Sequence, residues 1–319
     1  MLYSVIIPVY NRPDEIRELL NSLSLQSYKH FEVLVIEDGS TIGCKNVVEE
    51  FKDLLDVHYY FKENSGQGFS RNFGFKRAKG NYFVVFDSDC LVPGRYFQTV
   101  TEHIKESDFD FWGGPDKAHP DFTATQKAIN FSMTSILTTG GIRGRKKHLG
   151  NYHPRSFNMG ISRDAFEKSG GYRITRMGED IELSIRLEKL GFTSAFLEDA
   201  YVYHKRRTSL SEFFKQLHFF GRARINIGRF YSDEVKPVHW FPLLFTTGLL
   251  LSVLFLLFDI SRLPLLIYFI YAISLFTAGL IREKKITVAF LGALAAFIQL
   301  SAYAMGFLSE MISGTNNKP

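Results

Sequence analysis

Cysteine is scarce in this chain, and compositional bias is absent. The 319 residues include 2 cysteines, Cys44 and Cys90, which exclude a disulfide framework and show no spacing typical of metal ligands. We therefore expect a reducing compartment. No internal repeat and no low-complexity segment is found, which excludes repeat arrays. The chain is long enough for one large or two modest domains with a substantial core.

The chain also lacks a recognisable secretion signal and a strong charge of one sign. The first residues, "MLYSVIIPVYNR", turn polar too early for a secretory signal peptide. The formal net charge is +5, and we expect no nucleic-acid partner. Residues 312–319 include "GTNNKP" and are expected to form a frayed tail.

Apolar residues make up 45% of the chain but are concentrated near its end. The sequence is mixed up to Lys236 and mostly apolar beyond it. Between residues 237 and 311 there are three apolar runs, each near the ~20 residues that span a hydrocarbon layer. The runs are Val238–Phe258, Leu263–Ile281 and Ile286–Leu308. We predict about three transmembrane helices, with the alternative that Pro264 kinks or shortens a span and leaves two.

The stretch before these runs mixes aromatic and basic residues. Residues 208–236 include "SLSEFFKQLHFFGRARINIGRFY", which predicts an interfacial amphipathic helix, with a core helix as the alternative. The Lys and Arg of this stretch and of "REKK", between the last two runs, place both on the cytoplasmic side. Three spans then leave the tail outside. We expect a multi-pass membrane protein with its preceding part at the cytoplasmic face.

Strands and helices alternate in the first part of the chain. The strand-like runs are residues 3–11, 31–40, 57–63 and 81–89. The helical patterns between them are residues 12–27, 43–55 and 68–78. Pro13, followed by Asp14 and Glu15, suits the first turn of the first helix. This alternation predicts an α/β fold built from parallel βαβ units.

Polar sequences follow these strands, namely "PVYN", "EDGS", "ENSG" and "DSD". In open parallel sheets, ligands bind beyond the carboxyl ends of the strands, so four polar loops at one edge predict a site. Asp87 and Asp89 of "DSD" repel each other unless a cation such as Mg²⁺ or Mn²⁺ joins them. Such a metal would neutralise a leaving diphosphate. The alternative is that both aspartates only form a turn.

Five motifs occur in a familiar order and spacing: "SVIIPVYNR", "LVIEDGS", "GFSRNFG", "FDSD" and "GEDIELSIRLEKLGF". Together they resemble the inverting family 2 glycosyltransferases of the GT-A fold, over about two-thirds of the chain, from Leu2 to Arg207. The resemblance implies a Rossmann-like, mostly parallel sheet with flanking helices, followed here by an all-α transmembrane region. It also implies a nucleotide-sugar-binding half at residues 1–100 and an acceptor and catalytic half at residues 101–207.

The resemblance implies a donor site and a divalent metal. The residues implied to contact the donor are Pro8, Val9, Tyr10, Asn11, Asp38, Gly66, Arg71, Asp87, Ser88 and Asp89. Asp38 would accept a hydrogen bond from the base, and Glu37 departs from the aspartate that the family often has there. Arg71 would reach a phosphate, or alternatively pair with a nearby acid. Asp87 is expected at the ribose or the metal, and Asp89 at the metal itself.

The resemblance also implies catalytic and acceptor residues. Asp180, the second acid of "GED", is the expected general base of a single in-line displacement, with Glu179 in support. The alternative is that these acids only favour the dipole of a helix that begins there. Asn158 is the expected acceptor contact. His204 is the expected third metal ligand, with a purely structural histidine as the alternative.

Two further expectations concern segments around these residues. The helix that begins at the "ED" pair is expected to turn its apolar positions to the core: Ile181, Leu183, Ile185, Leu187 and Leu190. A basic loop is expected either as a solvated face or as an anion cradle: Arg143, Arg145, Lys146, Lys147 and His148.

The expected function is the transfer of one sugar, with inversion, from a nucleotide-diphosphate donor, with UDP as the expected nucleotide. The acceptor would be a hydroxyl of a lipid-linked molecule or glycan in cell-envelope assembly. A processive synthase is the alternative, but Gln216 is followed by "LHFF" and not by the x-x-R-W of such enzymes. A nucleotidyltransferase needs a glycine-rich, basic first loop that "PVYNRPDE" lacks. An inactive nucleotide-sugar-binding scaffold is disfavoured by the acids at positions 87, 89 and 180.

Overall fold

The computed structural model describes residues 1–139 and 152–313, and these residues form two compact units. One unit, the sheet unit, comprises Met1–His119 and His148–Lys205. The other, the helical unit, comprises Pro120–Lys147 and Arg206–Pro319. The described residues 120–139 thus pack with the C-terminal helices, and the assignment of residues 101–207 to an acceptor and catalytic half stays a prediction.

A mixed sheet of seven strands forms the centre of the sheet unit among the described residues, in the order β3-β2-β1-β4-β8-β6-β9. Its strands are β1 (Tyr3–Val9), β2 (Phe31–Asp38), β3 (Val57–Lys62), β4 (Tyr82–Phe86), β6 (Phe111–Gly113), β8 (Asn158–Ser162) and β9 (Ser194–Phe196). The first four are mutually parallel, as the alternating sequence pattern predicts. β8 runs antiparallel to both β4 and β6, and β9 is parallel to β6.

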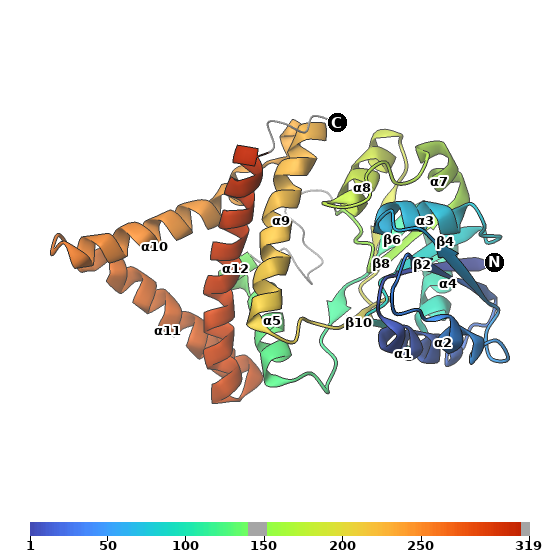
Figure 1. Ribbon diagram of the computed structural model, residues 1–319, viewed down its shortest axis with the longest axis horizontal. Helices are drawn as coiled ribbons and strands as arrows, with labels where there is room; N and C mark the ends of the chain where they lie inside the picture. Colours follow the sequence, from blue (N-terminus) through green and yellow to red (C-terminus); the bar gives the residue numbers. More distant parts are fainter. Residues whose placement is uncertain (140–151, 314–319) are drawn as a thin grey trace. The chain divides into compact units, whose positions relative to one another are not determined.

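Helices cover both faces of this sheet (Figure 1). They are α1 (Pro13–Ser24), α2 (Lys45–Glu49), α3 (Gln67–Phe75), α4 (Tyr96–Glu106), α7 (Arg163–Ser169) and α8 (Glu179–Lys189). Side chains alternate along β1, so that Val5 and Ile7 meet the apolar faces of α1, α2 and α4. Ile6 points to the other face, where it packs with residues of α3, α7 and α8. A sheet buried on both faces explains the continuous apolar runs in the sequence.

A second, three-stranded sheet brings distant segments together beside the end of β4. It consists of β5 (Cys90–Leu91), β10 (Val202–His204) and β7 (Asp116–Lys117), with β10 in the middle. In β10, His204 pairs with Cys90 across the antiparallel ladder. The ladder therefore places His204 directly next to the "DSD" segment, although the two are more than 100 positions apart in the chain.

The helical unit contains the apolar helices that the sequence predicts. Its helices are α5 (Ala124–Thr134), α6 (Ile136–Thr139), α9 (Leu210–Phe230), α10 (Phe241–Leu257), α11 (Leu263–Glu283) and α12 (Ile286–Ser313), with 3₁₀ turns at Ser232–Glu234 and Pro237–Trp240. Three segments of the described chain are long and apolar enough to cross a membrane: Pro237–Leu257, Leu263–Glu283 and Ile286–Ser313. The expected all-α region with long apolar helices is confirmed.

Two local expectations are wrong. The second helix was expected over residues 43–55, but α2 covers only Lys45–Glu49 and is followed by turns. Leu190 was expected in the core, but it follows the last helical residue of α8 and is 52% exposed. The first four apolar positions of that helix are buried as expected. Leu190 lies outward because the helix ends there and the chain turns through Gly191, whose φ is +89°.

Gly160 should tolerate no side chain. It pairs with Trp112 across the β6–β8 ladder, and a Cβ at position 160 would lie 2.0 Å from Cζ2 of the fully buried Trp112. Gly160→Ala should lower stability by about 1–3 kcal/mol, the usual cost of overpacking. Thermal unfolding followed by circular dichroism in mild detergent measures this change. Gly43→Ala is the matched control, since its nearest neighbour would be 3.4 Å away, and equal melting temperatures for the two variants would contradict the expectation.

Candidate active site

The loop after β4 carries the two aspartates of "DSD" in different surroundings. The Asp89 side chain is only 8% exposed and has two basic neighbours. Arg12 Nη1 donates to Oδ2 of Asp89 at 2.8 Å, and His204 Nε2 lies 3.1 Å from Oδ1. The loop itself is a tight turn, because the backbone N–H of Cys90 donates to the carbonyl of Asp87 at 3.1 Å. Asp89 is therefore the buried centre of a polar cluster.

Three side chains of this cluster are placed so that they could hold a metal ion. Ligand atoms of Asp89, Cys90 and His204 all lie within 4.8 Å of one another. A carboxylate oxygen and an imidazole nitrogen are suitable donors for Mn²⁺, so Asp89 and His204 fit the divalent metal that the sequence predicts. Cys90 is a poorer donor, since burial raises the pKa of its thiol well above the usual value.

The charge of His204 depends on its acidic neighbour. Burial alone would lower the pKa of the imidazole, but the charge of Asp89 and the hydrogen bond to it raise that pKa above its ordinary value. His204 also stacks on Phe157, with the ring centroids 5.0 Å apart. The ring is thus held facing the carboxylate of Asp89 by both packing and charge.

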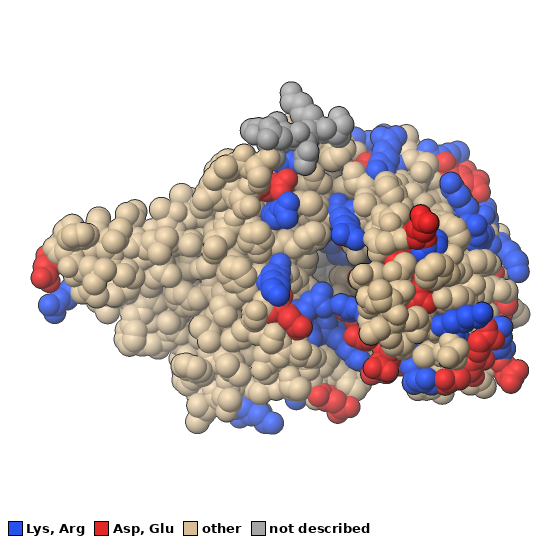
Figure 2. All heavy atoms as spheres, viewed as in Figure 1, with Lys and Arg blue, Asp and Glu red and all other residues tan. Residues whose placement is uncertain are grey.

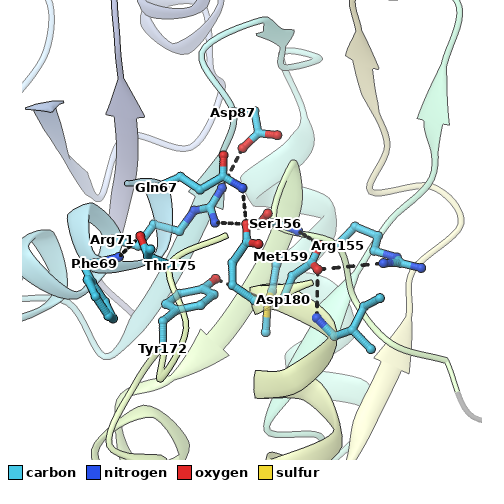
Figure 3. A network of polar contacts seen from close by, with 12 residues as sticks. Gln67, Phe69, Arg71, Asp87, Arg155, Ser156, Met159, Tyr172, Thr175 and Asp180 are labelled. Atoms are coloured by element: carbon cyan, nitrogen blue, oxygen red, sulfur yellow. Dashed lines mark hydrogen bonds and ion pairs between the residues drawn. The ribbon is translucent and has the colours of Figure 1, made fainter. Parts of the chain in front are cut away.

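Asp87 belongs to a separate network centred on Arg71 (Figure 3). Arg71 reaches from α3, and its side chain is only 1% exposed. Its Nη2 donates to Oδ1 of Asp87 at 2.9 Å, and its Nη1 donates to Oε1 of Glu179 at 3.1 Å. The guanidinium also lies over the ring of Tyr172, 5.4 Å from its centroid. The sequence analysis gave two options for Arg71, a contact with a phosphate or an ion pair with a nearby acid. In this structure Arg71 forms ion pairs with Asp87 and Glu179.

Glu179 is the first residue of α8 and is almost completely buried. Besides Arg71, the side-chain amide of Gln67 donates to the same carboxylate oxygen. Burial and the neighbouring charge of Asp180 raise the pKa of Glu179, and Arg71 opposes that rise. These contacts tie the beginning of α8 to the end of β4 through one arginine.

Asp180 follows immediately and faces a different segment (Figure 3). The backbone N–H groups of Ile181 and Ser156 donate to its carboxylate at 2.8 and 3.2 Å, and Arg155 Nη1 lies 3.8 Å away. The turn into α8 is unusual, because Met177 and Gly178 both have positive φ, +66° and +97°. This turn leaves the Asp180 side chain 15% exposed, while Glu179 beside it is enclosed.

The carboxylate of Asp38 holds the loop before α3 in place through hydrogen bonds. Its Oδ1 accepts hydrogen bonds from Lys62 Nζ at 2.5 Å and from the Ser65 N–H at 2.9 Å, and its Oδ2 accepts from the Gly66 N–H at 2.8 Å. Burial would raise the pKa of Asp38, but the bonds from Lys62 and Ser65 lower it. Gly66 has φ of +87°, and a Cβ there would meet Thr175 at 2.3 Å, so glycine is required.

The residues after β1 shape the neighbouring loop. Asn11 has φ of +55°, and its side-chain oxygen accepts bonds from the N–H groups of Thr41 and Ile42 at 2.8 and 2.9 Å. This contact joins the "PVYN" and "EDGS" loops at the carboxyl edge, as their sequence position predicts. Tyr10 is 52% exposed beside it. Pro8 is half-buried and Val9 is buried in β1, while Ser88 is buried between the two aspartates.

Asn158 lies inside the sheet unit and is fully buried. Tyr96 Oη donates to its side-chain oxygen at 2.6 Å, and its amide nitrogen donates to the carbonyl of Ala200 at 2.8 Å. Its described contacts therefore join β8 to α4 and to the segment before β10. A contact between Asn158 and an acceptor stays a prediction. The basic loop of residues 143–148 lies outside the described residues.

Several residues of the site were not singled out by the sequence, among them Arg12, Gln67 and Cys90. Each of these three is adjacent to a residue that was, since Arg12 ends "PVYNR", Gln67 follows Gly66, and Cys90 follows "DSD". Adjacency was the available signal. It could not show that Arg12 and Cys90 come together at Asp89.

The network of Arg71 makes a testable prediction. Arg71→Gln should lower the free energy of unfolding by about 3–5 kcal/mol, because two acids would lose their buried cation. Urea unfolding in mild detergent measures this through the fluorescence of Trp112 in a Trp240→Phe background, since the chain has 2 tryptophans. The double variant with Glu179→Gln should recover part of the loss.

The exposed Arg173→Gln is the matched control and should leave stability unchanged. If Arg71 instead served mainly to bind a phosphate, Arg71→Gln would keep near-normal stability and weaken only donor binding. That outcome would contradict the structural role of the network.

Comparison with known proteins identifies the family. Residues 4–170, more than half of the chain, match the family described as Glycosyl transferase family 2. An uncharacterized glycosyltransferase of Rickettsia felis (strain ATCC VR-1525 / URRWXCal2) is 37% identical over 108 residues, 34% of this chain and 18% of that protein. The match thus spans less than a fifth of that relative. Glycosyltransferase AglE of Haloferax volcanii is 25% identical over 254 residues, 77% of this chain and 81% of AglE.

Two solved structures share the fold. The mannosyltransferase PcManGT from Pyrobaculum calidifontis, solved with GDP-Man and Mn²⁺, has a TM-score of 0.59 at 18% identity, covering 96% of this chain and 86% of that one. TarS 1–349 from S. aureus, solved with UDP-GlcNAc, has a TM-score of 0.51 at 22% identity, covering 71% of this chain and 67% of that one. The mixed sheet with flanking helices is the GT-A fold, and the chain belongs to glycosyltransferase family 2.

Proposed function

We propose that this glycosyltransferase moves a single sugar, with inversion, from a nucleotide-diphosphate sugar to a hydroxyl of a lipid-linked or glycan acceptor. The observation that carries the proposal is the position of Arg71 between Asp87 of the donor motif and Glu179 of the "ED" pair. Through this arginine, the donor loop and the proposed base, Asp180, meet at one edge of the sheet. Such an edge is the usual place for a ligand in an open α/β sheet.

The donor would be held by the loops at the carboxyl edge. The proposed donor residues are those after β1 and β2, the loop at Gly66, and the "DSD" segment. The fixed geometry of the Asp38 loop supports this, because three hydrogen bonds hold that loop in place before any ligand binds. UDP is the proposed nucleotide. TarS was solved with UDP-GlcNAc and PcManGT with GDP-Man, so both support a nucleotide sugar as the donor class.

A divalent metal, Mg²⁺ or Mn²⁺, is proposed beside Asp89. Asp89 and His204 would hold it, with Asp87 as a further proposed ligand. When bound, such a cation neutralises charge on a departing diphosphate. The Mn²⁺ in PcManGT supports the choice of metal class. Arg12 already contacts the same carboxylate, so its guanidinium adds positive charge on the side of Asp89 away from His204.

Asp180 is the proposed general base. Inversion requires one carboxylate that removes the proton of the acceptor hydroxyl as its oxygen attacks the anomeric carbon. Asp180 is suited to this role because its side chain is partly exposed, while two backbone N–H groups orient it. Glu179 is proposed as its support, since the bond to Arg71 fixes the first turn of α8. The acceptor would approach from the side of Arg155 and Ser156.

The membrane position completes the proposal. The described chain has three helices long and apolar enough to cross a membrane, which would hold the enzyme beside a lipid-linked acceptor. We propose that the sheet unit lies on the cytoplasmic side of the membrane, where nucleotide sugars are available. The basic residues before Trp240 favour the same side.

Thermal-shift screening of nucleotide diphosphates and nucleotide sugars, with and without Mn²⁺, tests the donor directly. The absence of any stabilisation by such compounds would contradict the proposed function.

Asp89→Asn should abolish the metal dependence of donor binding, because it removes the charge that the proposed metal needs. Isothermal titration of UDP with and without Mn²⁺ measures this, and the two affinities should become equal. The exposed Asp164→Asn serves as the control and should retain the difference. Unchanged metal dependence in the Asp89 variant would refute the metal assignment.

Asp180→Asn should keep the fold and donor binding but lower the transfer rate by roughly 10²–10⁴-fold, the usual contribution of a positioned proton acceptor. Asp164→Asn is the control here also, since Asp164 lies in the first turn of α7 and shares the favourable position at a helix start. Transfer rate, UDP affinity and melting temperature are measured on the same preparation. Near-normal transfer with a lowered melting temperature would reduce Asp180 to a residue that stabilises the start of α8.

A further inference from the structure

Two helices of the helical unit, α9 and α12, pack against each other with almost no space between their backbones. A Cβ at Gly221 of α9 would lie 2.1 Å from the carbonyl oxygen of Tyr303 in α12. A Cβ at Gly306 of α12 would lie 1.9 Å from the carbonyl oxygen of His218 in α9. Glycine at these two positions therefore permits the contact, as small residues do in closely packed helix pairs.

The same pair continues to the end of α12, where it is polar. Glu310 is 6% exposed and lies between two arginines of α9. Arg222 Nε donates to its Oε2, and Arg229 Nη2 donates to its Oε1, each at 2.8 Å. The residue numbers of the contacting pairs increase together along both helices, from His218 beside Gly306 to Arg222 beside Glu310. The two helices thus run parallel, side by side, as Figure 1 also shows.

The apolar helices differ in how much protein covers them. In the most apolar part of α12, 44% of the residues are buried, against 11% in the corresponding parts of α10 and α11. Besides α9, α12 contacts α5, where Phe131 lies over Gly292. Its large exposed apolar side chains form a stripe: Ile286, Phe290, Leu294, Met305, Leu308, Met311 and Ile312. α10 and α11 instead expose apolar side chains on most sides.

This packing constrains where α12 can lie in a membrane. α9 is too polar to enter the hydrocarbon core, because it carries Lys215, Arg222, Arg224 and Arg229 within one helix. Charged side chains at bilayer depth are costly even when they are paired. If α12 crossed the bilayer, α9 would have to cross beside it. The sequence of α12 by itself would allow a span, but its partner does not.

We propose that α12 lies along the membrane surface together with α9, and that only α10 and α11 cross the bilayer. The occupant of the exposed stripe of α12 is then the boundary between lipid headgroups and acyl chains. The basic residues of α9 suit anionic headgroups at that level. This inference concerns membrane topology and does not depend on the proposed sugar transfer.

The hairpin of α10 and α11 has the features of a membrane insertion. In Figure 1 the two helices meet at a turn and diverge from it, and α12 forms the third side of a triangle. Asp259 and Arg262 lie at that turn and are exposed. Figure 2 shows charged groups at the tip and mostly neutral surface behind it. Helices of 17 and 21 residues are about 25 and 31 Å long, close to the thickness of the hydrocarbon layer.

The proposal changes the expected topology. Three spans would put the end of α12 on the opposite side from the sheet unit. Two spans return the chain, so that Ser313 lies on the same side as the sheet unit. The "REKK" segment at the joint of α11 and α12 then lies on that side also, together with the basic residues of α9.

Cysteine labelling in membranes tests this topology. Asn21→Cys on exposed α1, Arg262→Cys at the hairpin tip and Ser313→Cys at the end of α12 are made one at a time. Each is treated with a membrane-impermeant maleimide in intact spheroplasts and in inverted vesicles. The unaltered chain is the control, since Cys44 and Cys90 are 0% and 1% exposed. Labelling in detergent confirms that each introduced cysteine reacts.

The expected result is that Asn21→Cys and Ser313→Cys are labelled to the same extent in the same preparation, and Arg262→Cys only in the other one. Labelling of Ser313→Cys together with Arg262→Cys would mean three spans and would overturn the proposal. Labelling of Arg262→Cys on the side of Asn21→Cys, or its protection in both preparations, would mean that the hairpin does not cross and would overturn it as well.

Discussion

The guanidinium of Arg71 is the constraint on which the rest of the site depends. A cation that is fully buried must be matched by acids, because an unpaired charge in the interior is strongly destabilising. Asp87 at the end of β4 and Glu179 at the start of α8 provide those acids. Burial would lower the pKa of Arg71, but Tyr172 and the two acids raise it. The arginine thereby holds α3, the end of β4 and the start of α8 together at one edge of the sheet.

The other acids of that edge are held in the same manner. Asp38 is tied to the loop before α3, Asp89 to Arg12 and His204, and Asp180 to two backbone N–H groups. Each carboxylate therefore has its orientation before a ligand arrives. Preorganised charge is the usual source of transition-state stabilisation in enzymes, since it avoids reorganisation during the reaction. This arrangement agrees with the proposed sugar transfer at the carboxyl ends of β1 and β4.

Buried charge also organises the helical unit. Glu310 compensates Arg222 and Arg229, and the two glycines at positions 221 and 306 bring α9 and α12 into backbone contact. As a result, α12 can only take a position in the membrane that α9, a helix with four basic residues, can take beside it. The membrane position of α12 is then decided by its neighbour and not by its own composition. Among the described residues no basic helix packs along α10 or α11, and both retain the lipid-facing character that their sequences indicate.

The sequence by itself determined the parallel β1–β4 core, the acids at the strand ends and the long apolar helices, because hydrophobic periodicity and turn chemistry are local properties. It could not determine that Arg71 pairs with Asp87 and Glu179, that Arg12 and His204 contact Asp89, or that the described residues 120–139 pack with the C-terminal helices. Nor could it show that α9 lies along α12. The contacts of Arg71 with Glu179, of Arg12 with Asp89 and of His204 with Asp89 join residues more than 70 positions apart, and only the packed tertiary structure, in which buried charges must find partners, decides such contacts.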